Sequence, residues 1–162
     1  DLDLSYRIST SLARLQSALS VTWVDEYSSK DFAPLTTPDR VGIANYLGTI
    51  PEWRLIGSLT WEGSGWGVST TATFTPSYQD SDLTGPLDRR LPSRTVIDLQ
   101  TWLELDRLFD PACFDDMKIT AGALNLFDED VDFAKAGLMF GFDISQADLK
   151  QRFAYLRITK SF

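Results

Sequence analysis

The chain has 162 residues, of which 43% are hydrophobic and 23% charged, and its 23 acidic and 15 basic residues give a formal net charge of -8. This excess of acid argues against nucleic-acid binding, since proteins neutralise phosphates with clusters of Lys and Arg. The absence of histidine and the presence of one cysteine, Cys113, exclude His-based catalysis, imidazole zinc sites, internal disulfides and Cys-cluster metal sites.

Seven stretches of the chain alternate between apolar and polar residues, which is the pattern of β-strands with one apolar face. In the first stretch, Leu2, Leu4, Tyr6 and Ile8 alternate with polar residues. No stretch has the roughly 20 consecutive apolar residues of a membrane helix. In chain order, the predicted strands cover residues 2–8, 15–23, 53–62, 66–75, 97–106, 118–123 and 153–162.

The length and the ends of these stretches distinguish a membrane sheet from a soluble one. Several alternate for about 9–11 residues, which is enough to cross a bilayer at a tilt, whereas strands of soluble proteins are usually about 5–6 residues long. Six of the seven apolar rows lack charge; the exception, Lys160, lies near a chain end, where its stem can reach water. Aromatic residues near the ends of the rows are typical of the two membrane interfaces. The predicted interfacial residues are Trp23, Trp53, Trp61, Trp66, Phe74 and Tyr78.

The connections between the predicted strands alternate in length. They cover residues 10–13, 27–52, 63–65, 78–93, 107–116 and 127–151. Short periplasmic turns and long outer loops alternate in this way in transmembrane β-barrels. The order places the last residue in the periplasm and the first at the outer surface. Seven strands are an odd number with two unpaired edges, so we expect an all-β, antiparallel segment of a larger barrel.

Four stretches resemble the last part of TonB-dependent outer-membrane receptors. They are the hairpin PEWRLIGSLTWEGSGWGVSTTATF, the strand RTVIDLQTWLEL, the segment ITAGALNLFDEDVDFA and the final QRFAYLRITKSF. The most specific features are the motif Asn125, Leu126, Phe127, Asp128 and a terminal strand that ends in Phe162. The resemblance covers residues 50–162 well and the first part of the chain in pattern only.

This resemblance implies that residues 1–162 are the C-terminal part of a 22-stranded barrel in the outer membrane of a Gram-negative bacterium. The plug domain and the TonB-binding segment of such a receptor are absent from the sequence. The family imports scarce nutrients, most often ferric siderophores and otherwise cobalamin or oligosaccharides, with energy relayed by TonB. The implied partners are outer-membrane lipid, the receptor's own plug, TonB, the barrel-assembly machinery and a small-molecule ligand, with no cofactor and no enzymatic activity.

Roles of individual residues follow from the same position in the chain. Residues Tyr155, Leu156, Ile158 and Phe162 match the terminal strand that the barrel-assembly machinery recognises in this family. Lys160 departs from the apolar residue usual at its place. We expect Asn125 and Asp128 to bond the turn backbone rather than a ligand. The lumen-facing charges Arg7, Arg54, Asp98, Glu104 and Arg157 pair with the plug or with one another, or are solvated.

Two acidic stretches contain part of a calcium-binding loop. The spacing of Asp128, Asp130 and Asp132 fits the first three ligands of an EF-hand, but Phe133 replaces its glycine and Met139 its terminal Glu. The second stretch has Leu91 in place of the Glu, after Asp80, Asp82, Thr84 and Gly85. The sequence favours solvated loops at both places over metal sites.

Two other protein classes remain open at this point. A self-contained barrel of eight strands, structural or adhesive, would need another strand within residues 136–143, where Leu138, Phe140 and Phe142 alternate. A soluble β-fold that binds an apolar ligand would instead cover the apolar rows with a second layer.

Overall fold

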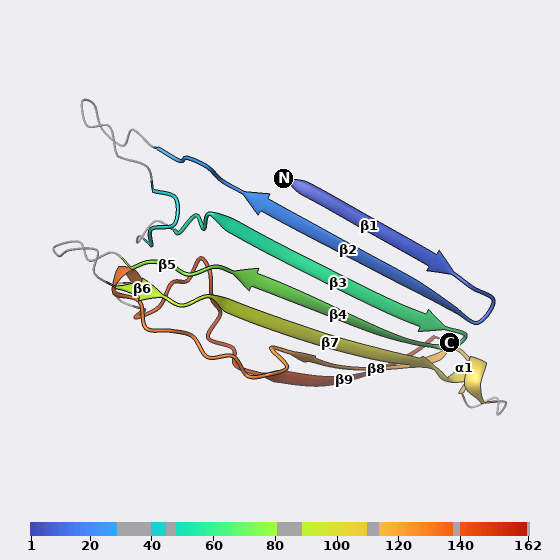
Figure 1. Cartoon of the computed structure of the whole chain (residues 1–162). Coiled ribbons are helices and arrows are strands. Elements are labelled where there is room, and N and C mark those ends of the chain that lie inside the picture. The colour runs from blue at the N-terminus through green and yellow to red at the C-terminus, as the bar shows by residue number, and fades with distance from the viewer. Residues whose placement is uncertain (29–39, 45–47, 81–88, 110–113, 138–139, 162) are drawn as a thin grey trace.

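The computed structural model describes residues 1–28, 40–44, 48–80, 89–109, 114–137 and 140–161. It confirms an all-β fold built on one antiparallel sheet, with the strands in the order β1-β2-β3-β4-β7-β8-β9 (Figure 1). The strands are β1 (Leu2–Ser9), β2 (Ala13–Trp23), β3 (Trp53–Gly63), β4 (Trp66–Thr75), β7 (Arg94–Glu104), β8 (Met117–Leu124) and β9 (Phe153–Lys160). The sheet is not closed, since β1 and β9 each pair with a single neighbour.

Three small elements lie in the connections. A hairpin of two short strands, β5 (Tyr78–Gln79) and β6 (Arg90–Leu91), interrupts the connection between β4 and β7. A single helical turn, α1 (Leu105–Leu108), follows β7, and a 3-10 turn, η2 (Lys135–Gly137), lies between β8 and β9. Within the described ranges, no helix is long and apolar enough to cross a membrane.

The register of the sheet joins the alternating rows into two continuous faces. Directly opposed residues of antiparallel strands point to the same face. One such row across five strands consists of Leu4, Leu19, Gly57, Ala72 and Ile97. On the other face, a row that begins three residues further along β1 consists of Arg7, Gln16, Thr60, Ser69 and Gln100. The sheet therefore has one apolar face and one polar face.

The sheet is a single layer among the residues that are described. Every buried hydrophobic residue lies outside the seven strands: Ala44, Tyr78, Leu91, Leu105, Ala134, Ala136 and Phe142. Along β1, every residue is exposed. The apolar face thus has no second layer of described residues packed against it, which distinguishes it from the core of a sandwich.

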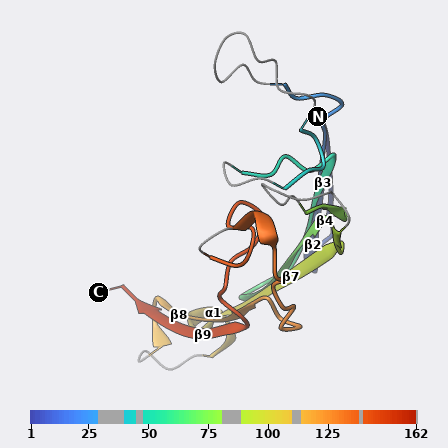
Figure 2. The ribbon, with the colours of Figure 1, turned by 90° about the vertical axis from the view of Figure 1, so that its left-hand side faces the viewer.

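The sheet is curved, and its polar face lies on the inside of the curve. Figure 2 shows that the connection between β8 and β9 lies within this concave side. Thr75 and Arg94, which are opposed in the register and continue the polar rows, line a small pocket together with Val131 and Asp143 of that connection. The apolar face is therefore the convex one.

The structure corrects the predicted end of the fifth strand. The alternation extends to residue 106, but β7 ends at Glu104, and Leu105 is buried in α1. The strand ends where its ladder with β4 ends: β4 begins at Trp66, which pairs with Leu103, and the Glu104 N–H donates to the Gly65 carbonyl in the turn before β4, so no residue of β4 remains to pair beyond Glu104. The strand gains three residues at its other end, where it begins at Arg94.

Two further expectations concern the end of the chain. Within residues 136–143, the described residues form no strand, so the eighth strand of a small barrel is not found there. The terminal Phe162 lies outside the described residues, as do Asp82, Thr84 and Gly85 of the second acidic stretch.

Candidate functional site

Two pairs of tryptophans mark the two ends of the apolar face. Trp23 and Trp53 are opposed at the end with the long connections, where their ring centroids are 5.9 Å apart. At the end with the short turns, Trp61 and Trp66 meet edge to face at 5.1 Å. Eight residues separate Trp53 from Trp61, or about 26 Å along β3. At a tilt of about 40° this becomes about 20 Å, close to the roughly 25 Å apolar band that aromatic girdles flank.

The surface between these tryptophans is apolar and exposed. The exposed fraction is 55% for Leu4, 42% for Leu59 and 68% for Leu156. Two threonines of this face direct their hydroxyls to the backbone: Thr70 donates to the Asp98 carbonyl at 2.9 Å, and Thr101 donates to the Gly67 carbonyl at 3.1 Å. These hydroxyls therefore have a hydrogen-bond acceptor without water.

The remaining residues with predicted interfacial or assembly roles lie in different places. Phe74 lies on the apolar face, opposed to Leu55, and Leu156 and Ile158 lie on the same face in β9. Tyr155 lies on the polar face instead. Tyr78 is buried among the connections with 7% of its surface exposed, so it does not join the exposed aromatic residues of the apolar face.

The register places five predicted charges on the polar face: Arg7, Arg54, Asp98, Glu104 and Arg157. None of them pairs with another. Asp98 accepts a hydrogen bond from the Asn125 backbone N–H at 2.8 Å, and Glu104 pairs with Arg107 at 2.9 Å. In the described part of the chain, Arg54 and Arg157 have no hydrogen-bond or ion-pair partner, whereas Arg7 donates to Gln16 at 3.3 Å.

Two aromatic side chains of the polar face lie flat over glycines of a neighbouring strand. A Cβ on Gly67 would lie 2.0 Å from the Trp102 ring, and a Cβ on Gly122 would lie 2.5 Å from the Tyr155 ring. The Tyr155 hydroxyl donates to Gln100 at 2.8 Å. The alternation does not predict these pairs; the signal in the sequence is a glycine within a strand pattern, which marks a close approach of another group.

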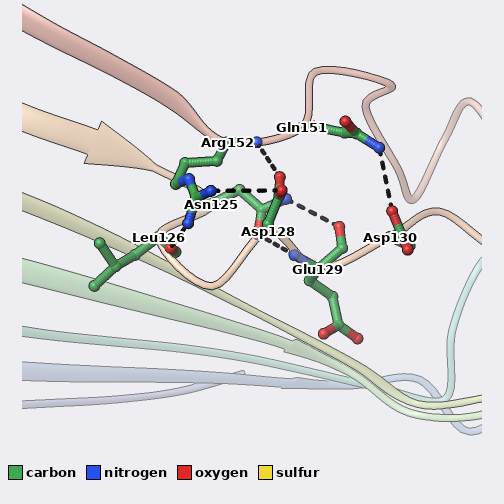
Figure 3. Close-up of polar contacts among 7 residues, drawn as sticks. All are labelled: Asn125, Leu126, Asp128, Glu129, Asp130, Gln151 and Arg152. Carbon is green, nitrogen blue, oxygen red and sulfur yellow. Dashed lines mark hydrogen bonds and ion pairs between the residues drawn. The ribbon is translucent and has the colours of Figure 1, made fainter.

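The Asn125–Asp128 motif forms the turn that follows β8 (Figure 3). Asn125 is buried, and its backbone is left-handed with φ 49°. Its side-chain amide binds one residue twice: Oδ1 accepts from the Glu129 N–H at 2.8 Å, and Nδ2 donates to the Glu129 carbonyl at 2.9 Å. Asp128 also has a positive φ, 60°, and its N–H donates to the Asn125 carbonyl at 2.9 Å. Asn and Asp adopt this conformation at lower cost than other side chains.

The same turn connects three strands. The Leu126 N–H donates to the Ile97 carbonyl of β7 at 2.7 Å. Asp128 accepts the Arg152 N–H at 2.7 Å, and its carboxylate lies 3.8 Å from the Arg152 guanidinium, one residue before β9 (Figure 3). Phe127 is 71% exposed. The motif thus fixes the entry into the last strand, and its polar groups are engaged by the protein itself.

The long connections pack against one another at one end of the sheet (Figure 1). Their buried residues form one cluster: Ala44, Tyr78, Leu91, Ala134 and Ala136. We call the described residues of 40–50, 78–91 and 134–147 the loop cap. Burial, followed by the charge and the hydrogen bond of Asp143, raises the pKa of Tyr78 well above its ordinary value of about 10.

Neither acidic stretch forms a metal site among the residues described. No three His, Cys, Asp or Glu side chains in those ranges lie close enough together to hold a metal ion. Asp80 directs its carboxylate inward, to backbone N–H groups of the loop cap. Asp128 and Asp130 bond residues just before β9, namely Arg152 and Gln151.

The comparisons with known proteins give no relative. No protein-family model matches the chain. No curated protein and no solved structure matches it either.

Proposed function

We propose that this chain is part of the barrel wall of a TonB-dependent receptor in the bacterial outer membrane. The observation that carries the proposal is a curved, single-layered sheet with an exposed apolar convex face and a polar concave face. A soluble curved sheet has the opposite arrangement, because its concave side encloses the apolar core. In a membrane wall, lipid covers the convex face and water or protein fills the inside.

The open edges of the sheet favour a large barrel over a small one. Lipid offers no hydrogen bonds, so each unpaired N–H or C=O group at an edge there costs several kcal/mol. In the proposed receptor, β1 and β9 pair with further strands of the barrel. A closed eight-stranded barrel needs one more strand, and the described residues of 136–143 do not supply it.

The transport activity is the part of the proposal that rests on the resemblance of residues 50–162. The ligand is a scarce nutrient, with a ferric siderophore as the first candidate. TonB, the receptor's plug and the barrel-assembly machinery are the proposed protein partners. The concave face would meet the plug, and Arg54 and Arg157, which have no partner among the described residues, offer positive charge for it.

Paired cysteine labelling tests the wall. In a Cys113→Ser background, Leu59→Cys and Thr60→Cys place bimane fluorophores on the convex and the concave face of β3. With the protein in lipid vesicles, brominated acyl chains should quench the Leu59 label, and aqueous iodide should quench the Thr60 label. Equal quenching of the two labels by brominated lipid would contradict a lipid-facing convex surface.

A genetic experiment tests the transport activity separately. Deleting the gene should abolish growth on at least one ferric siderophore, cobalamin or oligosaccharide, and deleting TonB should have the same effect. Uptake of all three nutrient classes at wild-type rates in the deletion strain would exclude nutrient import. The labelling result would still decide whether the chain is a membrane wall.

A further inference from the structure

The loop cap has its own hydrogen-bond network, in addition to its small apolar cluster. Backbone bonds join two of its segments: the Ala44 N–H donates to the Gln79 carbonyl at 2.7 Å, and the Gln79 N–H donates to the Gly42 carbonyl at 2.8 Å. The Asp80 N–H then donates to the Arg89 carbonyl at 3.0 Å. The cap therefore has the interstrand bonds of a small folded unit rather than those of separate loops.

Asp143 joins three segments of the cap through one carboxylate. Asp143 as a whole is only 7% exposed. Oδ2 accepts the hydroxyl of Thr49 and, at 3.1 Å, that of Tyr78. Oδ1 accepts the backbone N–H of Ser145 at 2.9 Å and its hydroxyl at 2.6 Å. Thr49 in turn donates its own N–H to the Ser145 hydroxyl at 2.8 Å, and the Gln146 amide donates to the Thr49 carbonyl at 2.8 Å.

Asp80 makes the second link. Its side chain is fully buried, and it accepts the backbone N–H groups of Lys135 at 2.9 Å and Ala136 at 3.0 Å. The Arg89 guanidinium lies 3.6 Å from the same carboxylate. A buried carboxylate that loses a hydrogen-bond partner is left with a large desolvation cost, so the loss of any one of these bonds destabilises the cap.

From this network we infer that the loop cap opens and closes as one cooperative body, which Asp143 holds together. The body lies at the end of β4 and the start of β7 on the polar side, where Asp143 and Gln146 share a pocket with Thr75 and Arg94. It covers the concave side at this end as one unit, so no single connection acts as an independent lid. The inference does not depend on the proposed membrane location.

Hydrogen–deuterium exchange of the full chain in detergent micelles tests the inference. Asp143→Asn should raise amide exchange about tenfold or more in the described residues of all three segments, namely 42–44 with 48–50, 78–80, and 134–137 with 140–147, and leave β2 and β3 unchanged. Asp148→Asn is the matched control, because it makes the same charge change in the same connection at a side chain that is 70% exposed. It should change exchange less than about twofold.

A milder variant keeps the test valid if Asp143→Asn prevents folding. Ser145→Ala removes the hydroxyl that links Asp143 to the Thr49 N–H and leaves the bonds from Tyr78 in place. It should raise exchange by a smaller, equal factor in the same three segments. Faster exchange confined to 143–147 in either variant would overturn the inference. Because exchange is measured without a nutrient or TonB, this result is separate from any failure of the proposed transport.

Discussion

The sheet and the loop cap are stabilised in different ways. The cap buries a small apolar cluster and two carboxylates whose hydrogen bonds come from its own segments. The seven strands have backbone ladders, yet they bury none of their large apolar side chains, and β1 is exposed throughout. Internal contacts account for the stability of the cap. The stability of the sheet also depends on what surrounds its convex face.

This difference gives opposite expectations for substitutions. A polar group placed on the convex face of the sheet removes no internal contact, so its cost measures the surroundings of that face. A substitution in the cap removes a named contact, so its cost measures the cap itself. Substitutions of both kinds, and one in the Asn125–Asp128 turn, therefore test this difference.

The largest effect is expected for an arginine at the middle of the convex face. Leu19 lies midway between Trp23 and Leu15, which is opposed to Trp61. Leu19→Arg should lower the free energy of unfolding in lipid vesicles by about 2–4 kcal/mol, the cost of Arg near a bilayer midplane. Tryptophan fluorescence during urea unfolding measures it.

The adjacent residue provides the control. Ala18→Arg makes the same change one residue away, on the concave polar face between Ser5 and Ser58. It should cost less than about 0.5 kcal/mol, as surface substitutions do. If the two variants are equally destabilised, the convex face is not in contact with lipid. The stability of the sheet would then not depend on the surroundings of that face.

The Asn125–Asp128 turn, which leads from β8 toward the 134–147 segment of the loop cap, should be the next most sensitive position. Asn125→Ala removes both side-chain bonds to Glu129 and puts a less tolerant residue at φ 49°. We expect a loss of about 2–3 kcal/mol, from roughly 1 kcal/mol per hydrogen bond and about 1 kcal/mol of backbone strain. Asn125→Gly should lose only the hydrogen-bond part. Equal losses for Ala and Gly in urea unfolding would show that the left-handed backbone contributes nothing.

The sheet could be predicted from the sequence, and the cap could not, for a physical reason. Alternation with period two is local, so the rows of Trp53 to Trp61 and Trp66 to Phe74 are visible in the printed residues and determine the register of the hairpin. The end of β7 depends on where β4 begins, which is not local, and the alternation predicts two residues too many there.

The cap depends on contacts between residues far apart in the chain. Asp143 meets Thr49 and Tyr78 across 94 and 65 positions, and no pattern near any of them indicates this. The sequence instead predicts Tyr78 at a membrane interface, because an aromatic residue at the end of a strand is a local signal. The role of Asn125 can be predicted from the sequence, because the side chain of an Asn in a turn bonds the nearby backbone.

The glycine–aromatic pairs should give a moderate effect within the sheet. Gly67→Ala places a methyl group against Trp102 and should cost about 1–2 kcal/mol, since the ring must move aside. Gly57→Ala is the matched control, because a Cβ there meets nothing within 4 Å. Combining Gly67→Ala with Trp102→Ala should cost less than the sum of the single variants. Strict additivity in urea unfolding would exclude a direct contact.

The smallest effect at neutral pH is expected for Tyr78→Phe, at about 1 kcal/mol, because Asp143 keeps its other donors.

The contribution of Tyr78 to stability should decrease at high pH. The folded chain holds the Tyr78 proton above pH 10, where the unfolded chain releases it, since the folded pKa is the higher one. This residue's contribution is thus complete below about pH 10 and falls above it. Between pH 9 and 11.5, the urea midpoint of the wild type should fall more steeply than that of the variant. Parallel curves would mean that the phenol is not buried against Asp143.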